Sequence, residues 1–305
     1  MNSKYGKALQ ITKRFSLLAS LFTILLVVSC ASRSNVKTSS KDRNAEFALL
    51  APGGVVYLYI DVPGTRPVLD RISFEGIQGS QGAQILDRTT SAVAAFYPEG
   101  MPRRFLAAVQ GRYPSFQAKL SFTLSPSWKK RRSETGASYW HAVKNGVSVS
   151  LGSSSALISD GDPFVQPPGV ETPEGFEEFC RGTVMAGWME DASGPLNNFL
   201  ASMEIPLQIP AKQVFFSLYT SGQEYETVIQ IETPSVSQAK ALVTLFSMAR
   251  LFMANAEASL GVVAVLFANP PVQDGPYLRL HTGSLDAQGI ALLFTMFSLY
   301  SINKN

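Results

Sequence analysis

Two stretches of this 305-residue chain carry the same succession of sequence patterns, and this repetition constrains the fold more than any single motif. Each stretch opens with an apolar run typical of a strand, at residues 55–60 in the first and 184–190 in the second. An aspartate follows each run, Asp61 and Asp191. Because self-similarity over several elements indicates a duplicated unit, we expect two units with one topology. A chance likeness between two sets of short elements is the alternative.

Both stretches continue with an apolar helical segment, at residues 67–72 and 195–203, and then with two strand patterns. The strands are expected at residues 91–97 and 103–111 in the first stretch, and at 214–219 and 225–232 in the second. In the last of these, apolar or aromatic side chains alternate with polar ones, which is the pattern of a half-buried strand. We therefore predict one β-hairpin in each unit.

A Pro-Ser pair begins the next helix in both stretches, Pro114-Ser115 and Pro234-Ser235. A serine at this place can accept a hydrogen bond from the N–H groups of the first helical turn, so we expect both serines to cap their helices. Two further strands are then expected around the dipeptides Asn145-Gly146 and Asp274-Gly275. Such dipeptides provide the positive φ that tight hairpins require.

The predicted order in each stretch is β-α-β-β-α-β-β, with a further helix at residues 172–180 after the first and 287–300 after the second. Hairpins dominate and few connections are long enough for a parallel crossover. We therefore predict an α+β fold of two similar units, each an antiparallel sheet with helices packed on it. The first unit is placed at residues 47–170 and the second, with the C-terminal helix, at residues 171–305.

The first thirty residues have the layout of an export signal. Their basic residues, with no acidic residue among them, are Lys4, Lys7, Lys13 and Arg14. An apolar stretch follows at residues 15–28, and it is shorter than the roughly 20 residues of a transmembrane helix, so cleavage is expected. Val27-Val28-Ser29-Cys30 resembles the lipobox of bacterial lipoproteins, with Val27 where leucine is commoner.

This resemblance implies that residues 1–29 are removed and that Cys30 carries acyl chains such as palmitate. At about 0.8 kcal/mol per buried methylene group, two or three chains hold a protein on a membrane. The residue after the cysteine is Ala31 and not the aspartate that retains such proteins at the inner membrane, which favours the outer membrane. An ordinary secretory signal that ends near a cysteine is the alternative.

Residues 30–46 are polar and predict a flexible tether with a reach of roughly 20 Å. Four of the 26 Lys and Arg residues lie in the signal, which leaves 22 against 23 Asp and Glu. This near-neutral balance argues against a nucleic-acid partner. Only Lys129-Lys130-Arg131-Arg132 is locally basic, and we expect a solvated loop there, with contact to anionic lipid headgroups or another polyanion as the alternative.

Patterns for catalysis or metal binding are weak. The two histidines, His141 and His281, have no partner at ligand spacing, so no metal site is predicted. Asp160-Gly161-Asp162 lacks the remainder of a calcium loop and is interpreted as a turn. The serines at 153–155 stand outside any nucleophile motif, although a triad with His141 stays open because triads assemble in space.

The remaining polar candidates are interpreted as structural. Cys180 is expected to be a small buried residue, because a lone thiol is most often one. Asp61 and Asp191 are expected to stabilise turns rather than to act in catalysis. No catalytic residue and no cofactor is therefore predicted, and Cys30 is the one functional site.

The last predicted helix is unusual because residues 290–297 are apolar on nearly every side, apart from Thr295. Such a helix is buried in the core or covered by a partner or a second copy. We predict a membrane-anchored, non-enzymatic envelope lipoprotein that binds a partner protein or has a structural role. One alternative is a carrier for an apolar small molecule, motivated by 19 Phe and 8 Met, and another is an envelope-acting hydrolase using His141 and a serine. Residues 47–305 suggest no established family.

Overall fold

The computed structural model describes residues 50, 53–72, 86–98, 103–144, 146–165, 176, 180–194, 197, 208–255, 265 and 267–293. The chain divides into two compact units. The first contains Met1–Arg66 and Ser73–Arg181, and the second contains Pro67–Ile72 and Gly182–Lys304. The domain boundaries predicted at residues 47–170 and 171–305 stay a prediction.

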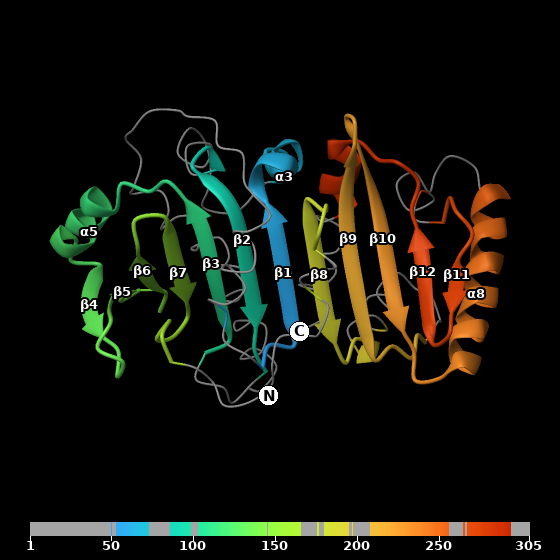
Figure 1. Ribbon diagram of the computed structural model, residues 1–305, viewed down its shortest axis with the longest axis horizontal. Coiled ribbons are helices and arrows are strands. Elements are labelled where there is room, and N and C mark those ends of the chain that lie inside the picture. Colours follow the sequence, from blue (N-terminus) through green and yellow to red (C-terminus); the bar gives the residue numbers. More distant parts are fainter. Residues whose placement is uncertain are drawn as a thin grey trace, which may run out of the picture. The chain divides into compact units, whose positions relative to one another are not determined.

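The first unit is an antiparallel sheet with helices attached (Figure 1). Its strands are β1 (Val56–Asp61), β2 (Thr89–Phe96), β3 (Phe105–Gly111), β4 (Trp128–Arg132), β5 (Ser138–Ala142), β6 (Ser148–Leu151) and β7 (Ser155–Ser159). They pair in the order β1-β2-β3-β7-β6-β5-β4, and each of these pairings is antiparallel. Helix α3 (Val62–Leu69) follows β1, and α5 (Ser115–Leu124) connects β3 to β4.

Helix α5 covers the core of the first unit where β4 and β5 lie. Ala118 and Phe122 are its buried residues. The ring of Phe122 lies 4.5 Å from the ring of Trp128 and 5.8 Å from that of Trp140, measured between centroids. Apolar area removed from water stabilises by about 25 cal/mol per Å². This aromatic cluster therefore attaches α5 to the sheet through one face of the helix.

The second unit is also an antiparallel sheet. Its strands are β8 (Met185–Glu190), β9 (Gln213–Ser221), β10 (Glu224–Glu232), β11 (Val272–Asp274) and β12 (Tyr277–His281), paired in the order β8-β9-β10-β12-β11. Helix α8 (Val236–Asn255) connects β10 to β11 and lies beside β11 and β12 (Figure 1). It buries Leu242 and Phe246 against Ile231, Leu278 and Leu280.

The predicted α+β fold of two similar units is confirmed. Strands β1-β2-β3-β7-β6 and β8-β9-β10-β12-β11 have the same sheet order, and α5 and α8 each follow the third strand of their unit. Both predicted hairpins form, β2 with β3 and β9 with β10. The helices predicted at residues 172–180 and 195–203 lie mostly outside the described residues, whereas the last helix is present from 287 to 293.

The first unit departs from the predicted order because four strands, not two, follow α5. By sheet position, β6 and β7 correspond to β11 and β12. The turn equivalent to Asp274-Gly275 is therefore the one after β6, where the N–H of Gly152 donates to the carbonyl of Ser155 at 2.8 Å. Gly146 has the expected positive φ, 74°, but lies between β5 and β6. The turn dipeptides did not identify equivalent hairpins, because the β5–β6 hairpin and the β11–β12 hairpin both need residues with positive φ.

Two local predictions were wrong. The basic run 129–132 is not a solvated loop but lies within strand β4, because its backbone pairs with β5 while its side chains stay exposed. Charged side chains on a terminal strand hinder unwanted pairing with other chains. Ser115 does not cap α5, since it is already the first helical residue and Pro114 is the cap position. Ser235 does accept a hydrogen bond from the N–H of Gln238, at 3.3 Å, as predicted.

Helix α3 begins earlier than the segment predicted at 67–72, directly after β1, and contains Pro67 in its interior. The hydroxyl of Thr65 donates to the carbonyl of Asp61 at 2.7 Å and thereby joins the end of β1 to the helix. A proline inside a helix removes one backbone donor, which is why the sequence pattern suggested a start at that residue.

Candidate functional site

The most distinctive surface of the described residues is an exposed apolar stripe on α5. Phe116, Leu120 and Leu124 are 78%, 48% and 74% exposed. They are four residues apart, so they lie along one side of the helix. The opposite side carries the buried Ala118 and Phe122, and α5 is therefore apolar on two sides. Burial of large apolar side chains is favourable, so such a stripe in water indicates a contact with another apolar surface.

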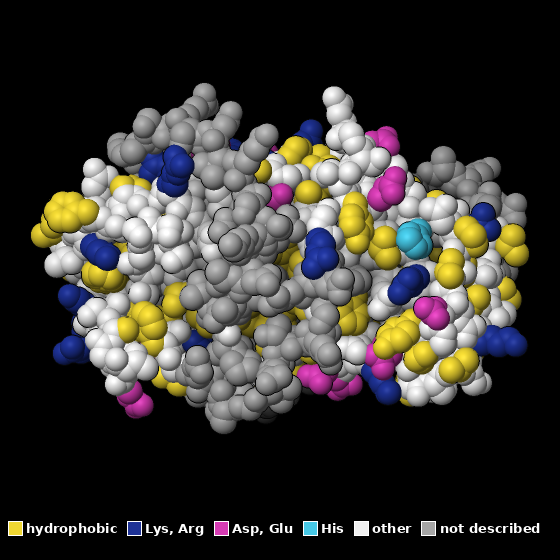
Figure 2. Space-filling view, viewed as in Figure 1, with side chains coloured by type: hydrophobic (Ala, Val, Ile, Leu, Met, Phe, Trp, Pro, Cys, Tyr) yellow, Lys and Arg dark blue, Asp and Glu magenta, His cyan; other side chains and the backbone are white. Residues whose placement is uncertain are grey.

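Strand β4 places positive charge next to this stripe. Side chains alternate along a strand, so Lys130 and Arg132 share a face with Trp128, whose ring contacts Phe122 of α5. The Nζ atom of Lys130 lies 5.9 Å from the ring centroid of Trp140, which is cation–π distance. Figure 2 shows hydrophobic side chains over α5 and Lys and Arg side chains beside them at β4. We call Phe116, Leu120, Leu124, Lys130 and Arg132 the α5–β4 surface.

His141 lies on β5, as predicted, but its contact differs from the triad considered from the sequence. Its Nδ1 atom shares a hydrogen bond of 3.1 Å with the hydroxyl of Ser148 on β6, and not with the serines at 153–155. Burial, and then the positive charge of Arg131, lowers the pKa of His141. His281 is exposed on β12. In the part of the chain that the structure describes, no three His, Cys, Asp or Glu residues are grouped as metal ligands.

Asp160 and Asp162 form a turn, as predicted. The Asp160 carboxylate accepts hydrogen bonds from the backbone N–H groups of Arg104 and Phe105, at 2.9 and 3.2 Å. The Asp162 carboxylate accepts one from the N–H of Phe164, at 2.9 Å. These bonds connect the end of β7 to the start of β3, so the two carboxylates have structural roles.

Arg103 was missed by the sequence analysis, because arginine is rarely buried. Its side chain is almost fully buried, and Nη1 donates to the carbonyls of Asp162 and Pro163 at 3.3 and 3.0 Å. The guanidinium also lies 5.7 Å from the ring centroid of Tyr97. Burial lowers the pKa of Arg103, and Tyr97 and the two nearby aspartates oppose that change. Arg103 therefore stabilises the same β3–β7 connection as the carboxylates.

The other candidates have structural positions. Cys180 is fully buried, as predicted. Asp191 directly follows β8 and has a φ of 46°, a left-handed conformation that Asp tolerates better than most residues. Asp61 ends β1 and contributes its backbone carbonyl to the bond with Thr65. Cys30 lies outside the described residues.

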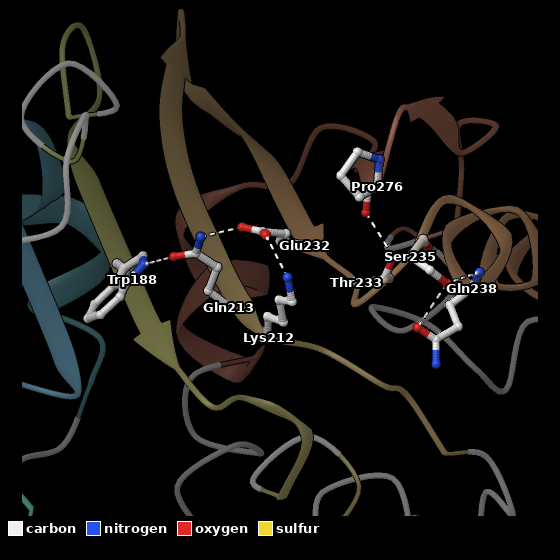
Figure 3. Close-up of polar contacts among 8 residues, drawn as sticks. All are labelled: Trp188, Lys212, Gln213, Glu232, Thr233, Ser235, Gln238 and Pro276. Atoms are coloured by element: carbon white, nitrogen blue, oxygen red, sulfur yellow. Dashed lines mark hydrogen bonds and ion pairs between the residues drawn. The ribbon is translucent and has the colours of Figure 1, made fainter.

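A chain of polar contacts crosses three strands of the second unit (Figure 3). The indole N–H of Trp188 on β8 donates to the Gln213 side-chain oxygen on β9, at 2.7 Å. The Gln213 amide donates in turn to the carboxylate of Glu232 on β10, which also lies 3.7 Å from the Nζ of Lys212. Thr233 donates to the carbonyl of Pro276 at 2.9 Å. These contacts join strands and contain no activated nucleophile.

Two further observations concern the relation to membranes. No helix among the described residues combines the length and the apolarity needed to cross a bilayer. In the described beginning of the last helix, Ile290, Ala291 and Leu293 are buried and Leu292 is 47% exposed. Most of the apolar side chains in this part of the helix are therefore buried.

Comparison with known proteins identifies the class of protein that this chain resembles. Residues 41–161 match the family model of the outer membrane-associated lipoprotein TP0453. The chain is similar to an outer membrane-associated lipoprotein. It is 22% identical to outer membrane protein TP0453 of Treponema pallidum (strain Nichols) over 203 residues, which cover 62% of this chain and 70% of that protein. The matched segment includes β1 to β7 and the α5–β4 surface.

Solved structures of TP0453 have the same fold. Crystal form III aligns with a TM-score of 0.57 and 19% sequence identity, over 82% of this chain and 97% of that chain. Crystal form I aligns with a TM-score of 0.57 over 83% of this chain and 97% of that chain. At this identity the structural likeness supports the fold alone.

These findings confirm the predictions of an envelope lipoprotein and of an outer-membrane location. They correct the statement that residues beyond the tether suggest no family, since the matched segment begins at residue 41. The names of the matched proteins state membrane association and no enzymatic activity.

Proposed function

We propose that this protein is a non-enzymatic lipoprotein, anchored by acyl chains on Cys30, and that its α5–β4 surface rests on the same membrane. In this proposal residues 1–29 are the signal peptide, residues 30–46 are the tether, and the two units follow at residues 47–170 and 171–305. The observation that carries the proposal is the exposed stripe of Phe116, Leu120 and Leu124 beside a basic strand.

The physical balance favours a membrane over water for this surface. Full burial of a Leu or Phe side chain stabilises by about 1.5–3 kcal/mol. A Lys or Arg near an anionic membrane surface adds about 1 kcal/mol. Helices with a large apolar face and flanking basic residues lie in the plane of the interface in this way. The tether keeps the surface at a high local concentration near the bilayer, so even a weak contact is populated.

The surface is tested with Cys30→Ala protein, which lacks the acylation site, by sedimentation with phospholipid vesicles. We expect binding that is stronger when part of the phosphatidylcholine is replaced by phosphatidylglycerol. A triple variant, Phe116→Glu, Leu120→Glu and Leu124→Glu, is expected to remain in the supernatant. Because these side chains are exposed, the changes leave the core intact.

The matched control replaces Val236, Met248 and Leu251 on α8, which are 55%, 48% and 63% exposed, by glutamate and so adds the same charge. This variant is expected to bind vesicles like its parent. Loss of binding in both variants would indicate a general charge effect and contradict a specific α5–β4 contact. Co-purification of a protein that depends on Phe116, Leu120 and Leu124, without vesicle binding, would favour a partner protein instead.

The anchor is tested separately. Wild-type protein is expected in the membrane fraction, and mass spectrometry of its N-terminal peptide is expected to show acyl groups on Cys30. Unmodified Cys30 in membrane-bound protein would contradict the anchor but leave the α5–β4 surface standing.

A further inference from the structure

The basic side chains on the two faces of β4 differ in their contacts. On the face toward α5, Lys130 contacts the Trp140 ring, and the Nε of Arg132 donates to the carbonyl of Gly136 at 2.9 Å. On the other face, Lys129 and Arg131 are exposed and have no ion pair or hydrogen-bonded side chain among the described residues. Two positive charges are therefore held close together on a strand, and no described residue forms an ion pair with either of them.

Strand register places His141 beside these two charges. Lys129 is directly opposite His141, and Arg131 is opposite Tyr139. Directly opposed residues have Cβ atoms about 4.5–5.5 Å apart, and diagonal ones about 7–8 Å. His141 therefore has Lys129 as its cross-strand neighbour and Arg131 on the diagonal. The influence of Arg131 on the pKa of His141 agrees with this proximity.

The position of the His141 ring is determined by the next strand. His141 is opposite Ser148 in the β5–β6 pair, and the hydroxyl of this buried serine contacts Nδ1 at 3.1 Å. Because Nδ1 is engaged, Nε2 is the ring nitrogen that remains for a ligand. The imidazole is half-buried, so its orientation is better defined than that of the two exposed basic side chains.

We propose that Lys129, Arg131 and His141 form an anion-binding site that takes a phosphate group, on the face of the sheet opposite α5. Arginine matches phosphate oxygens with two parallel N–H donors, and lysine adds a compact charge. His141 provides a third donor from Nε2 when its ring carries the proton there. The bound group is either a free phosphate or the phosphate of a lipid headgroup, which present the same oxygens.

The chain contains only two histidines, which makes the test selective. Protein with Cys30→Ala is labelled with ¹³C-histidine, so that NMR reports His141 and His281 as two separate signals. Inorganic phosphate is added at constant ionic strength, with chloride as the reference. We expect phosphate to raise the pKa of His141, because a neighbouring dianion favours the imidazolium form. The His281 signal, from the second unit, is the internal reference.

Strand alternation provides matched variants. The pair Lys129→Gln and Arg131→Gln is expected to weaken phosphate binding about tenfold or more, because two charge-assisted hydrogen bonds are lost. The pair Lys130→Gln and Arg132→Gln removes the same charge from the same strand and is expected to retain the His141 response to inorganic phosphate, whatever its effect on vesicle binding through the α5–β4 surface. An equal loss in both pairs, or equal responses of His141 and His281 in the parent protein, would overturn the site.

A second arm distinguishes the two sources of the phosphate group. The same signals are measured with vesicles of phosphatidylglycerol and phosphatidylcholine, and with phosphatidylcholine alone. A His141 response to inorganic phosphate in the millimolar range supports a small phosphate compound as ligand. A response to anionic vesicles alone supports a headgroup, and no response to either overturns the proposal. The α5–β4 surface is tested by other residues, so either proposal can fail without the other.

Discussion

The two units share a sheet order but differ at the end where their helices pack. In the second unit the sheet ends at β11, a strand of three residues, and the 20-residue helix α8 lies beside it. In the first unit two further strands, β5 and β4, extend the sheet, and the shorter helix α5 lies over them. The second unit thus ends in a short strand, β11, and the first unit ends in a basic strand, β4. A short strand and a charged strand both hinder pairing with other chains, and only the charged strand β4 adds positive charge to the surface.

The helices differ in the same way. Helix α8 buries Leu242 and Phe246, and the two strands beside it, β11 and β12, contain a single Lys or Arg residue, Arg279. Helix α5 buries Phe122 and exposes an apolar stripe next to four consecutive basic residues. The comparison therefore assigns the membrane contact to the first unit and leaves α8 with a role in the core.

The largest effects are expected from the aromatic residue that attaches each helix. Phe122→Ala and Phe246→Ala each remove a large buried ring, and such changes cost about 3–5 kcal/mol. Phe122→Ala is expected to loosen α5 and abolish vesicle binding, because the stripe loses its support. Phe246→Ala is expected to lower stability while vesicle binding persists. Chemical denaturation and vesicle sedimentation measure the two properties, and equal loss of binding in both variants would remove the distinction between the helices.

A smaller effect separates the two helix starts. Ser235→Ala removes a capping hydrogen bond to the N–H of Gln238 and is expected to cost about 1 kcal/mol. Ser115→Ala removes no capping bond and is expected to change the free energy of unfolding by less than about 0.5 kcal/mol. Urea denaturation of the two variants checks this order. A greater loss of stability for Ser115→Ala than for Ser235→Ala would contradict the capping roles assigned to the two serines.

The smallest effect concerns pH and is confined to the first unit. Burial and Arg131 lower the pKa of His141 in the folded protein, so the unfolded chain binds a proton more readily at that residue. Stability is therefore expected to fall as pH decreases below about 6.5, the ordinary value for histidine, toward the lowered value of the folded state. His141→Gln is expected to flatten this part of the pH profile. A profile that keeps its slope in the variant would assign the effect to other groups.

The elements that sequence reasoning identified are those with a strong local pattern. The alternation of apolar and polar residues was sufficient to predict the hairpin of β9 and β10. The position of Ser235 before a helical pattern was sufficient to predict the helix cap. The run 129–132 has no alternation of polarity, and its strand conformation depends on pairing with β5. The composition of one segment does not show which other segment it pairs with.

The candidate site was harder to predict from the sequence than the fold, for a related reason. The four-residue spacing of Phe116, Leu120 and Leu124 is visible in the sequence, and this signal would have found the stripe. Ala118 and Phe122 lie between them, however, and only the packing against Trp128 and Trp140 decides which side of α5 faces water. The pairing of His141 with Ser148 likewise depends on the register of β5 and β6.

The most direct test of the membrane contact is hydrogen–deuterium exchange of the Cys30→Ala protein, compared with and without vesicles of phosphatidylglycerol and phosphatidylcholine. We expect vesicles to slow exchange in α5 and β4, over residues 115–132, and to leave α8 unchanged over residues 236–251. This result would place the first unit on the bilayer. Equal exchange of α5 in the two conditions, or protection of α8 in its place, would contradict the account.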